Sequence, residues 1–204
     1  MTDKLSNKNL ALFDFDGTLT DADMFTKFLK FSATKKRAWL IKLTLLPLYG
    51  FYKLGLFPAP TLRKLASFVA YKNKPIRFLR PLGEEFALKV IPKHLRKQAI
   101  ERLQWHLQQG DTVVVVSASI NLYLEPWCHS LGIGLICSEL TTQNDKFTGL
   151  YINGDVSNHT KAERVKSMFN LKEFKRIYAY GDTPEDHALL SLADEQYMNW
   201  VRLK

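Results

Sequence analysis

The sequence predicts an α/β fold in which buried strands alternate with helices along one globular unit. Three short apolar segments, 10–15, 112–116 and 177–180, each run directly into glycine or polar residues, as buried strands do where they end. Helical patterns punctuated by prolines fill the stretch between the first two segments. With 204 residues and 46% apolar content, the chain has the size of one globular unit that carries an inserted subdomain.

The first apolar segment ends in two carboxylates. Asp14 and Asp16 stand two residues apart just before Gly17, and residues i and i+2 of an extended chain point to the same face. Like charges held so close repel each other unless a cation lies between them, and oxygen ligands favour Mg²⁺. The alternative is an exposed Asp-Gly turn with two solvated acids, but a hairpin turn has no need of a second Asp before it. The pattern therefore predicts a magnesium site at the end of this strand.

The stretch that follows is strongly basic. Residues 24–103 hold 18 Lys or Arg against 3 acids, whereas the rest of the chain holds 11 basic residues against 17 acids. We expect an acidic core that carries a basic helical insertion. The helical patterns lie at 24–37, 61–72, 75–90 and 92–109.

Within this insertion, residues 39–57 are almost all apolar and are interrupted by two lysines, a proline and two glycines. They are marginal as a membrane-spanning helix, because a span needs about 20 apolar residues. Two interpretations stay open: a buried helical hairpin, or a segment lying in the interface of an anionic membrane. The surrounding basic charge favours the membrane surface, where each Lys or Arg adds about 1 kcal/mol.

The second and third strand segments bring further candidate residues. Ser117 and Ala118 follow residues 112–116, and a hydroxyl with free backbone N–H groups at a strand-to-helix junction suits a phosphoryl oxygen. Taken alone, the same pattern is also typical of a core strand with a cap residue. Asp182 and Asp186 follow residues 177–180 and are further candidate site residues. The alternative is that they serve only as a helix N-cap and a first-turn acid.

These segments, together with Lys161 near a predicted helix start, resemble the four motifs of the haloacid dehalogenase superfamily of phosphotransferases. The first motif is Asp-x-Asp-Gly-Thr at 14–18, the second is the strand ending in Ser117, and the fourth is Gly-Asp-x-x-x-Asp at 181–186. The resemblance covers residues 9–200. It implies a doubly wound, Rossmann-like parallel sheet formed by 1–22 and 92–204, with a helical cap at 23–91.

The resemblance also implies a Mg²⁺-dependent phosphatase that works through an aspartyl-phosphate. Asp14 takes the role of the nucleophile, and Asp16 that of general acid and then general base. Asp14, the backbone carbonyl of Asp16, and Asp182 are the implied metal ligands, braced by Asp186. The implied phosphate-binding residues, among which Ser117 and Lys161 also count as catalytic, are Gly17, Thr18, Ser117, Ala118 and Lys161.

Within the superfamily, the chain is similar to the phosphoserine-phosphatase-like branch (subfamily IB). Asp23-Met24-Phe25, followed by the apolar basic segment, resembles a bacterial group that includes phosphatidylglycerophosphatase C. Phosphoserine phosphatases usually carry Glu where Asp23 stands, so Asp23 is a candidate cap or substrate-binding residue. The implied substrate is a lipid-linked phosphate such as phosphatidylglycerol phosphate. The alternatives are a soluble phosphate (phosphoserine, or a sugar or polyol phosphate) and a membrane-associated binding protein without activity.

Partners and location follow from composition. Cys128 and Cys137 are too few for a disulfide framework, so we expect free thiols in a reducing cytoplasm. The N-terminal residues lack the apolar core of a signal peptide. We therefore expect a cytoplasmic protein with peripheral contact to the anionic inner membrane. No nucleic-acid partner is expected, because no recognised module is present and an apolar run is a poor companion for a phosphate backbone.

Overall fold

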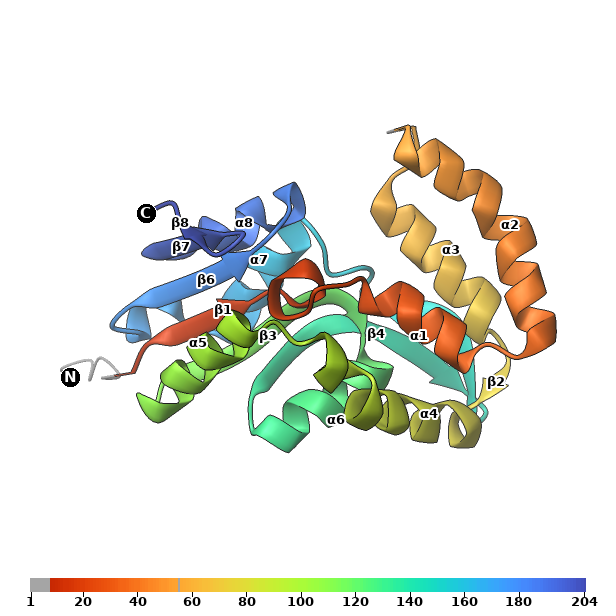
Figure 1. The fold of residues 1–204 in the computed structure, drawn as a ribbon, viewed down its shortest axis with the longest axis horizontal. Helices are drawn as coiled ribbons and strands as arrows, with labels where there is room; N and C mark the ends of the chain where they lie inside the picture. The colour runs from red at the N-terminus through yellow and green to blue at the C-terminus, as the bar shows by residue number, and fades with distance from the viewer. Residues whose placement is uncertain (1–7, 55) are drawn as a thin grey trace.

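The computed structural model describes residues 8–54 and 56–204 and contains an eight-stranded, mostly parallel sheet (Figure 1). The strand order is β2-β5-β4-β3-β1-β6-β7-β8, in which β4, β3, β1, β6 and β7 run parallel. The predicted α/β fold is thereby confirmed. The strands are β1 Leu10–Phe13, β2 Lys74–Pro75, β3 Thr112–Ile120, β4 Gly134–Gln143, β5 Lys146–Ile152, β6 Ile177–Gly181, β7 Glu195–Met198 and β8 Val201–Arg202.

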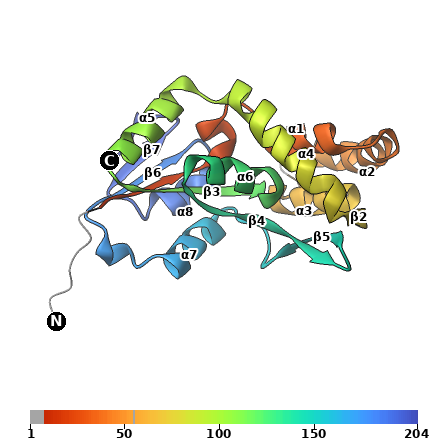
Figure 2. The same ribbon diagram turned by 90° about the horizontal axis from the view of Figure 1, so that it is seen from below.

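Helices cover both faces of this sheet (Figure 2). α5 (Lys97–Gln108) and α6 (Asn121–Leu131) pack on one face, and α7 (His159–Met168) and α8 (His187–Leu190) pack on the other. The alternation of a strand explains why both faces are apolar: Ala11 and Phe13 of β1 join one core cluster, whereas Leu10 and Leu12 join the second.

Four helices stand between β1 and β3: α1 (Met24–Ser32), α2 (Lys35–Lys53), α3 (Ala59–Tyr71) and α4 (Ile76–Lys89). α2 and α3 form a hairpin in which α3 packs against β5 of the sheet and α2 lies against α3 (Figure 1). α4 packs closely on α6. The two helices approach so closely that a Cβ atom added at Gly83 would lie 2.0 Å from the backbone oxygen of Leu122. The insertion is therefore anchored to the core through both α3 and α4.

Two expected helices differ from those observed. The helix expected over 24–37 is divided, because Ala33 adopts an extended backbone (φ −77°, ψ 127°) that ends α1. The helix expected over 92–109 begins only at Lys97. The preceding residues form the 3₁₀ turn η2 (Ile91–His94), and Leu95 pairs with Thr20 in an isolated β-bridge, which requires extended backbone.

The apolar segment 39–57, of which residue 55 lies outside the described part, falls mostly in α2. Within residues 8–54 and 56–204, no helix combines the length and apolarity needed to cross a bilayer. The hairpin interpretation matches the backbone, since α2 packs beside α3. That interpretation also expects buried side chains, and in this respect it differs from the structure, because Trp39 and Leu43 are 63% and 58% exposed.

Candidate active site

The site lies where the carboxyl ends of β1, β3 and β6 meet, the edge at which parallel α/β sheets generally bind ligands. β1 is central and in register with both neighbours, so that Phe13 pairs with Val115 and with Tyr180. Asp14 is the first residue after β1, and its N–H donates to the Tyr180 carbonyl at 2.9 Å. The strand order therefore fixes the position of Asp14.

A buried ammonium group joins two of the predicted carboxylates. Lys161, in the first turn of α7, donates from Nζ to Asp14 Oδ1 at 2.5 Å and to Asp186 Oδ1 at 2.6 Å. All three side chains are almost fully buried. The two carboxylates raise the pKa of Lys161, which keeps it charged. Burial raises the pKa of Asp14, while the charge and the hydrogen bond of Lys161 lower it and favour the carboxylate anion.

Asp186 is held on its other side by backbone. Its Oδ2 accepts from the N–H groups of Asp182 and Thr183, both at 3.1 Å, as part of a capping box at the turn η4 (Pro184–Asp186). Both oxygens of Asp186 are thus engaged. These contacts are compatible with the bracing role that the resemblance implies for Asp186, which stays a prediction.

Three carboxylates form a group with the composition of a divalent cation site. One oxygen each of Asp14, Asp182 and Asp186 lie within 4.8 Å of one another. Thr18 donates to Asp182 Oδ1 at 3.2 Å, and a Cβ atom at Gly17 (φ +86°) would lie 2.0 Å from Asp182 Oδ2. Only glycine lets the chain pass so close to this carboxylate. The all-oxygen donors, with three carboxylates facing one ammonium group, fit Mg²⁺.

The carboxylate of Asp16 has different partners from that of Asp14. β1 ends at Phe13, so the expectation that the two acids share a face of this strand is wrong. Asp16 lies in the turn η1 (Phe15–Leu19), where its backbone is extended (φ −76°, ψ 116°). Asp16 Oδ1 accepts from the Met24 N–H at 2.6 Å, and Oδ2 accepts from the Ser119 hydroxyl. Burial, and then the charge of Asp23, raise the pKa of Asp16 to about 7. The contribution of its backbone carbonyl to a metal stays a prediction.

Ser117 and Ala118 lie in the second half of β3. Ser117 is buried, and its Oγ accepts from the Ser119 N–H at 3.0 Å, which leaves its own hydroxyl proton for donation. Ala118 is half-buried beside it. These positions are compatible with phosphate binding, which stays a prediction for both residues.

Asp23 lies at the surface as the N-cap of α1. Its carboxylate accepts from the Thr26 N–H at 2.9 Å and from the Thr26 hydroxyl at 2.6 Å. An aspartate in this position stabilises a helix start without any ligand. Its position therefore gives a structural reason for the residue, and its role toward a substrate stays a prediction.

Three residues contact the site or its supports without having been predicted as site residues from the sequence. Ser119 and Tyr123 extend from Asp16, with the Tyr123 hydroxyl donating to Ser119 Oγ at 2.6 Å. Arg96 donates from Nε to the carbonyls of Gly17 and Thr20, at 3.0 and 3.1 Å, and so fixes the η1 turn. Ser119 stands two residues after Ser117 in the same strand, and this spacing is the sequence feature that could have indicated Ser119 as a site residue.

Arg63 links the insertion to the core. From α3 it donates to both carboxylate oxygens of Asp155, at 2.9 and 3.1 Å, and to Glu185 at 3.1 Å. Glu185 belongs to the η4 turn between Asp182 and Asp186, and Asp155 precedes α7, which carries Lys161. A single guanidinium therefore ties α3 to the loop that precedes α7 and to the η4 turn.

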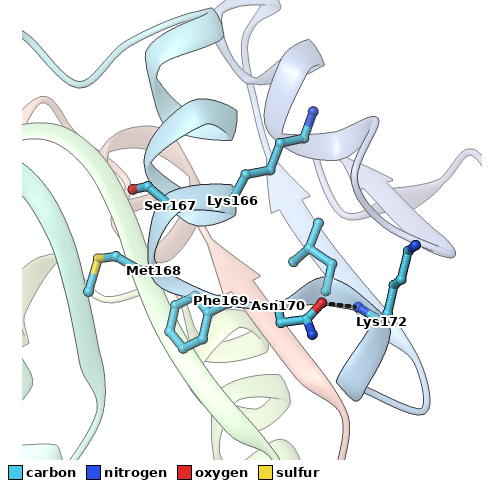
Figure 3. A pocket seen from close by; sticks show the side chains of 7 residues that line it. Lys166, Ser167, Met168, Phe169, Asn170 and Lys172 are labelled. Atoms are coloured by element: carbon cyan, nitrogen blue, oxygen red, sulfur yellow. Dashed lines mark hydrogen bonds between the residues drawn. The ribbon is translucent and has the colours of Figure 1, made fainter.

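Two hollows in the described surface lie away from the carboxylate cluster. One, of about 520 Å³, is lined by residues 166–172 at the end of α7 (Figure 3). The other, of about 450 Å³, lies between α7 and α8 and is lined by residues that include His159 and His187. Neither lining contains a predicted site residue. The carboxylate cluster, rather than a surface hollow, therefore defines the site.

Comparison with known proteins gives a family and two curated relatives. Residues 11–191 match the model of the haloacid dehalogenase-like hydrolases. The chain is 29% identical to the protein CicA of Caulobacter vibrioides, covering 96% of this chain and 88% of that protein. It is 28% identical to a histidinol-phosphatase of Neisseria meningitidis, covering 92% and 88% respectively.

Solved structures share the fold. A Bordetella pertussis protein of unknown function superposes with a TM-score of 0.77 at 22% identity, covering 95% of this chain and 90% of that one. A substrate-bound phosphoserine phosphatase superposes with a TM-score of 0.67 at 16% identity, covering 95% and 86%. At these identities the likeness concerns the fold alone.

Proposed function

Because the chain belongs to the haloacid dehalogenase-like hydrolases, we propose that it hydrolyses phosphate monoesters through an aspartyl-phosphate on Asp14. The observation that carries this proposal is the contact between Lys161 Nζ and Asp14 Oδ1 at 2.5 Å, inside a carboxylate cluster that fits Mg²⁺. A carboxylate in this setting needs no base to act as a nucleophile, since its anion is the reactive form.

In the first step, one carboxylate oxygen of Asp14 forms a bond to phosphorus as the bond from phosphorus to the ester oxygen breaks. Lys161 holds Oδ1, so the other oxygen faces the phosphate. Asp16 gives its proton to the leaving oxygen, and its pKa of about 7 keeps a useful fraction protonated at neutral pH. The products are the free alcohol and the aspartyl-phosphate.

In the second step, a water oxygen forms a bond to phosphorus and the bond to Asp14 breaks. Asp16, now ionised, takes the proton from this water, so both residues return to their starting states. Ser117 and Lys161, with the N–H groups of Gly17, Thr18 and Ala118, are proposed to bind the phosphoryl oxygens. Mg²⁺ held by Asp14, Asp182 and the Asp16 carbonyl would supply charge stabilisation for those oxygens.

For the substrate we propose a small soluble phosphate monoester, enclosed beneath a helical cap formed by 23–91. The bridge from Arg63 to Asp155 and Glu185 supports this, because it holds α3 against the loop before α7 and against the turn beside Asp182 and Asp186. The histidinol-phosphatase of Neisseria meningitidis, by its name, acts on an amino-alcohol phosphate, and we propose a phosphate of this kind here.

A lipid-linked phosphate is the second candidate. Trp39, Leu43, Leu54 and Leu56 are all more than half exposed on α2 and the turn after it, within the most basic part of the chain. Apolar side chains with basic neighbours are the combination that binds an anionic membrane surface. On this alternative, phosphatidylglycerol phosphate would reach Asp14 from a bilayer beside the hairpin.

The nucleophile is tested by Asp14→Asn. Phosphate release from p-nitrophenyl phosphate should fall by at least about 10³-fold, because the variant keeps the shape but loses the attacking anion. The wild-type protein, quenched in acid during turnover of a radiolabelled phosphate, should carry label that hydroxylamine removes. Steady turnover by the purified variant would rule out the aspartyl-phosphate.

The two substrate classes are separated by the variant Trp39→Ser/Leu43→Ser. We expect wild-type protein to release phosphate from soluble amino-alcohol and polyol phosphates, and the variant to keep that rate. Leu88→Ser, at a 75% exposed position on α4, is the matched control. If release occurs only from phosphatidylglycerol phosphate in anionic vesicles and the α2 variant alone loses it, the lipid candidate is correct.

A further inference from the structure

We propose that Ser119 and Tyr123 are positioning residues that orient the Asp16 carboxylate for proton transfer to and from the substrate. This inference rests on the proposed function of Asp16. Its basis is a continuous chain of hydroxyl groups, in which Tyr123 donates to Ser119 Oγ at 2.6 Å and Ser119 donates to Asp16 Oδ2.

The two oxygens of Asp16 are held from opposite sides by different elements. The Met24 N–H at the start of α1 binds Oδ1, whereas the Ser119 hydroxyl at the end of β3 binds Oδ2. Turning the carboxylate plane would break both hydrogen bonds at once. A reacting group needs such fixed orientation, because small displacements from the productive geometry cost rate.

Ser119 is itself fixed on more than one side. Its Oγ accepts from Tyr123 while donating to Asp16, and its backbone N–H donates to Ser117 Oγ at 3.0 Å. Ser119 is 1% exposed and Tyr123 is fully buried. Water therefore has little access to replace either hydroxyl, and hydrogen bonds in such surroundings are stronger than in solvent.

The ring of Tyr123 is packed independently of its hydroxyl. It lies 5.0 Å from Phe28 and 5.2 Å from Phe86, measured between ring centroids. Tyr123→Phe should therefore keep the ring in place and remove only the first hydroxyl of the chain. Ser119→Ala removes the hydroxyl that binds Asp16, and Ser119→Thr restores it.

The test compares kcat/KM for two substrates that differ in their leaving group. A p-nitrophenolate departs readily without a proton, whereas an alkoxide needs one, so misplacing Asp16 should harm alkyl phosphates more than aryl phosphates. For Ser119→Ala we expect kcat/KM to fall by about tenfold more for an alkyl phosphate than for p-nitrophenyl phosphate. Ser119→Thr should recover the wild-type ratio, and Tyr123→Phe should show a smaller change in the same direction.

Two matched controls remove buried hydroxyls that do not contact Asp16. Ser67→Ala breaks a 2.6 Å hydrogen bond to Tyr151, and Tyr71→Phe breaks one to Ser32. Both should keep the wild-type ratio of alkyl to aryl turnover, even where thermal stability falls. An equal loss for both substrates in Ser119→Ala and Tyr123→Phe would show a structural role only and would overturn the inference.

Asp16→Asn separates this inference from the proposed function. If Asp16→Asn keeps the wild-type kcat/KM for the alkyl phosphate, the proposed acid–base role of Asp16 fails. If Asp16→Asn loses alkyl turnover while Ser119→Ala and Tyr123→Phe keep the wild-type ratio, the role of Asp16 stands and the positioning inference fails.

Discussion

The carboxylate cluster around Lys161 and the α2–α3 hairpin belong to one chain but are organised differently. In the cluster, charged groups are buried and each carboxylate described there accepts at least one hydrogen bond. On α2, Trp39 and Leu43 expose large apolar side chains to solvent. Buried charges demand specific partners, whereas an exposed apolar face tolerates many. The comparison teaches that the arrangement of side chains is tightly specified in the cluster and loosely specified on the outer face of α2.

The largest expected effect is on the cluster. Lys161→Met leaves Asp14 and Asp186 buried without their shared cation, so the free energy of unfolding in EDTA should fall by about 3–5 kcal/mol. Phosphate release should be lost as well. Urea unfolding followed by fluorescence measures the first quantity. Lys166→Met, at an exposed position of the same helix, should change little, and an equal effect of both variants would contradict the comparison.

A smaller effect is expected where the two regions meet. Arg63→Gln removes the guanidinium that pairs with the buried Asp155, and we expect a loss of about 2 kcal/mol in the free energy of unfolding. Limited proteolysis between α2 and α3 should also become faster. Lys89→Gln removes an exposed pair with Glu85 on α4 and should cost less than about 0.5 kcal/mol. Unchanged proteolysis in Arg63→Gln would mean that the bridge does not hold the hairpin.

The smallest effect concerns a buried polar network in the core, remote from the hairpin. His106 is fully buried between Asp111 Oδ2 at 2.7 Å and the Tyr180 hydroxyl at 2.9 Å. Burial lowers the pKa of His106 in the folded protein below its ordinary 6.5. At a pH between the folded and the unfolded pKa, the unfolded chain therefore binds more protons than the folded protein. Its contribution to stability is therefore complete above about pH 6.5 and is lost as pH falls toward the folded pKa.

His106→Gln should accordingly flatten the dependence of the melting temperature on pH between about pH 7.5 and pH 5. His159→Gln, at an exposed position at the start of α7, is the control and should keep the wild-type slope. If the slope is the same in all three proteins, the acid sensitivity arises from groups other than His106.

Much of the core could be predicted because local rules and burial agree there. The apolar segments became β1, β3 and β6, and Gly17 adopts the positive φ that permits contact with Asp182. The partners of Asp16 could not be predicted, because the η1 turn redirects its carboxylate toward Ser119. The bridge from Arg63 to Asp155 joins residues 92 positions apart, and no local pattern encodes such a contact.

The close approach of Gly83 to Leu122 has a consequence for which positions of the chain tolerate substitution. Because α4 is locked onto α6 by backbone contact, the outer surface of α2 plays little part in holding the nucleophile in place. Substitutions can therefore accumulate at positions such as Trp39 and Leu43 with little cost to folding. We therefore expect the outer face of α2 to accept many side chains, whereas any residue larger than glycine at position 83 would collide with the Leu122 backbone.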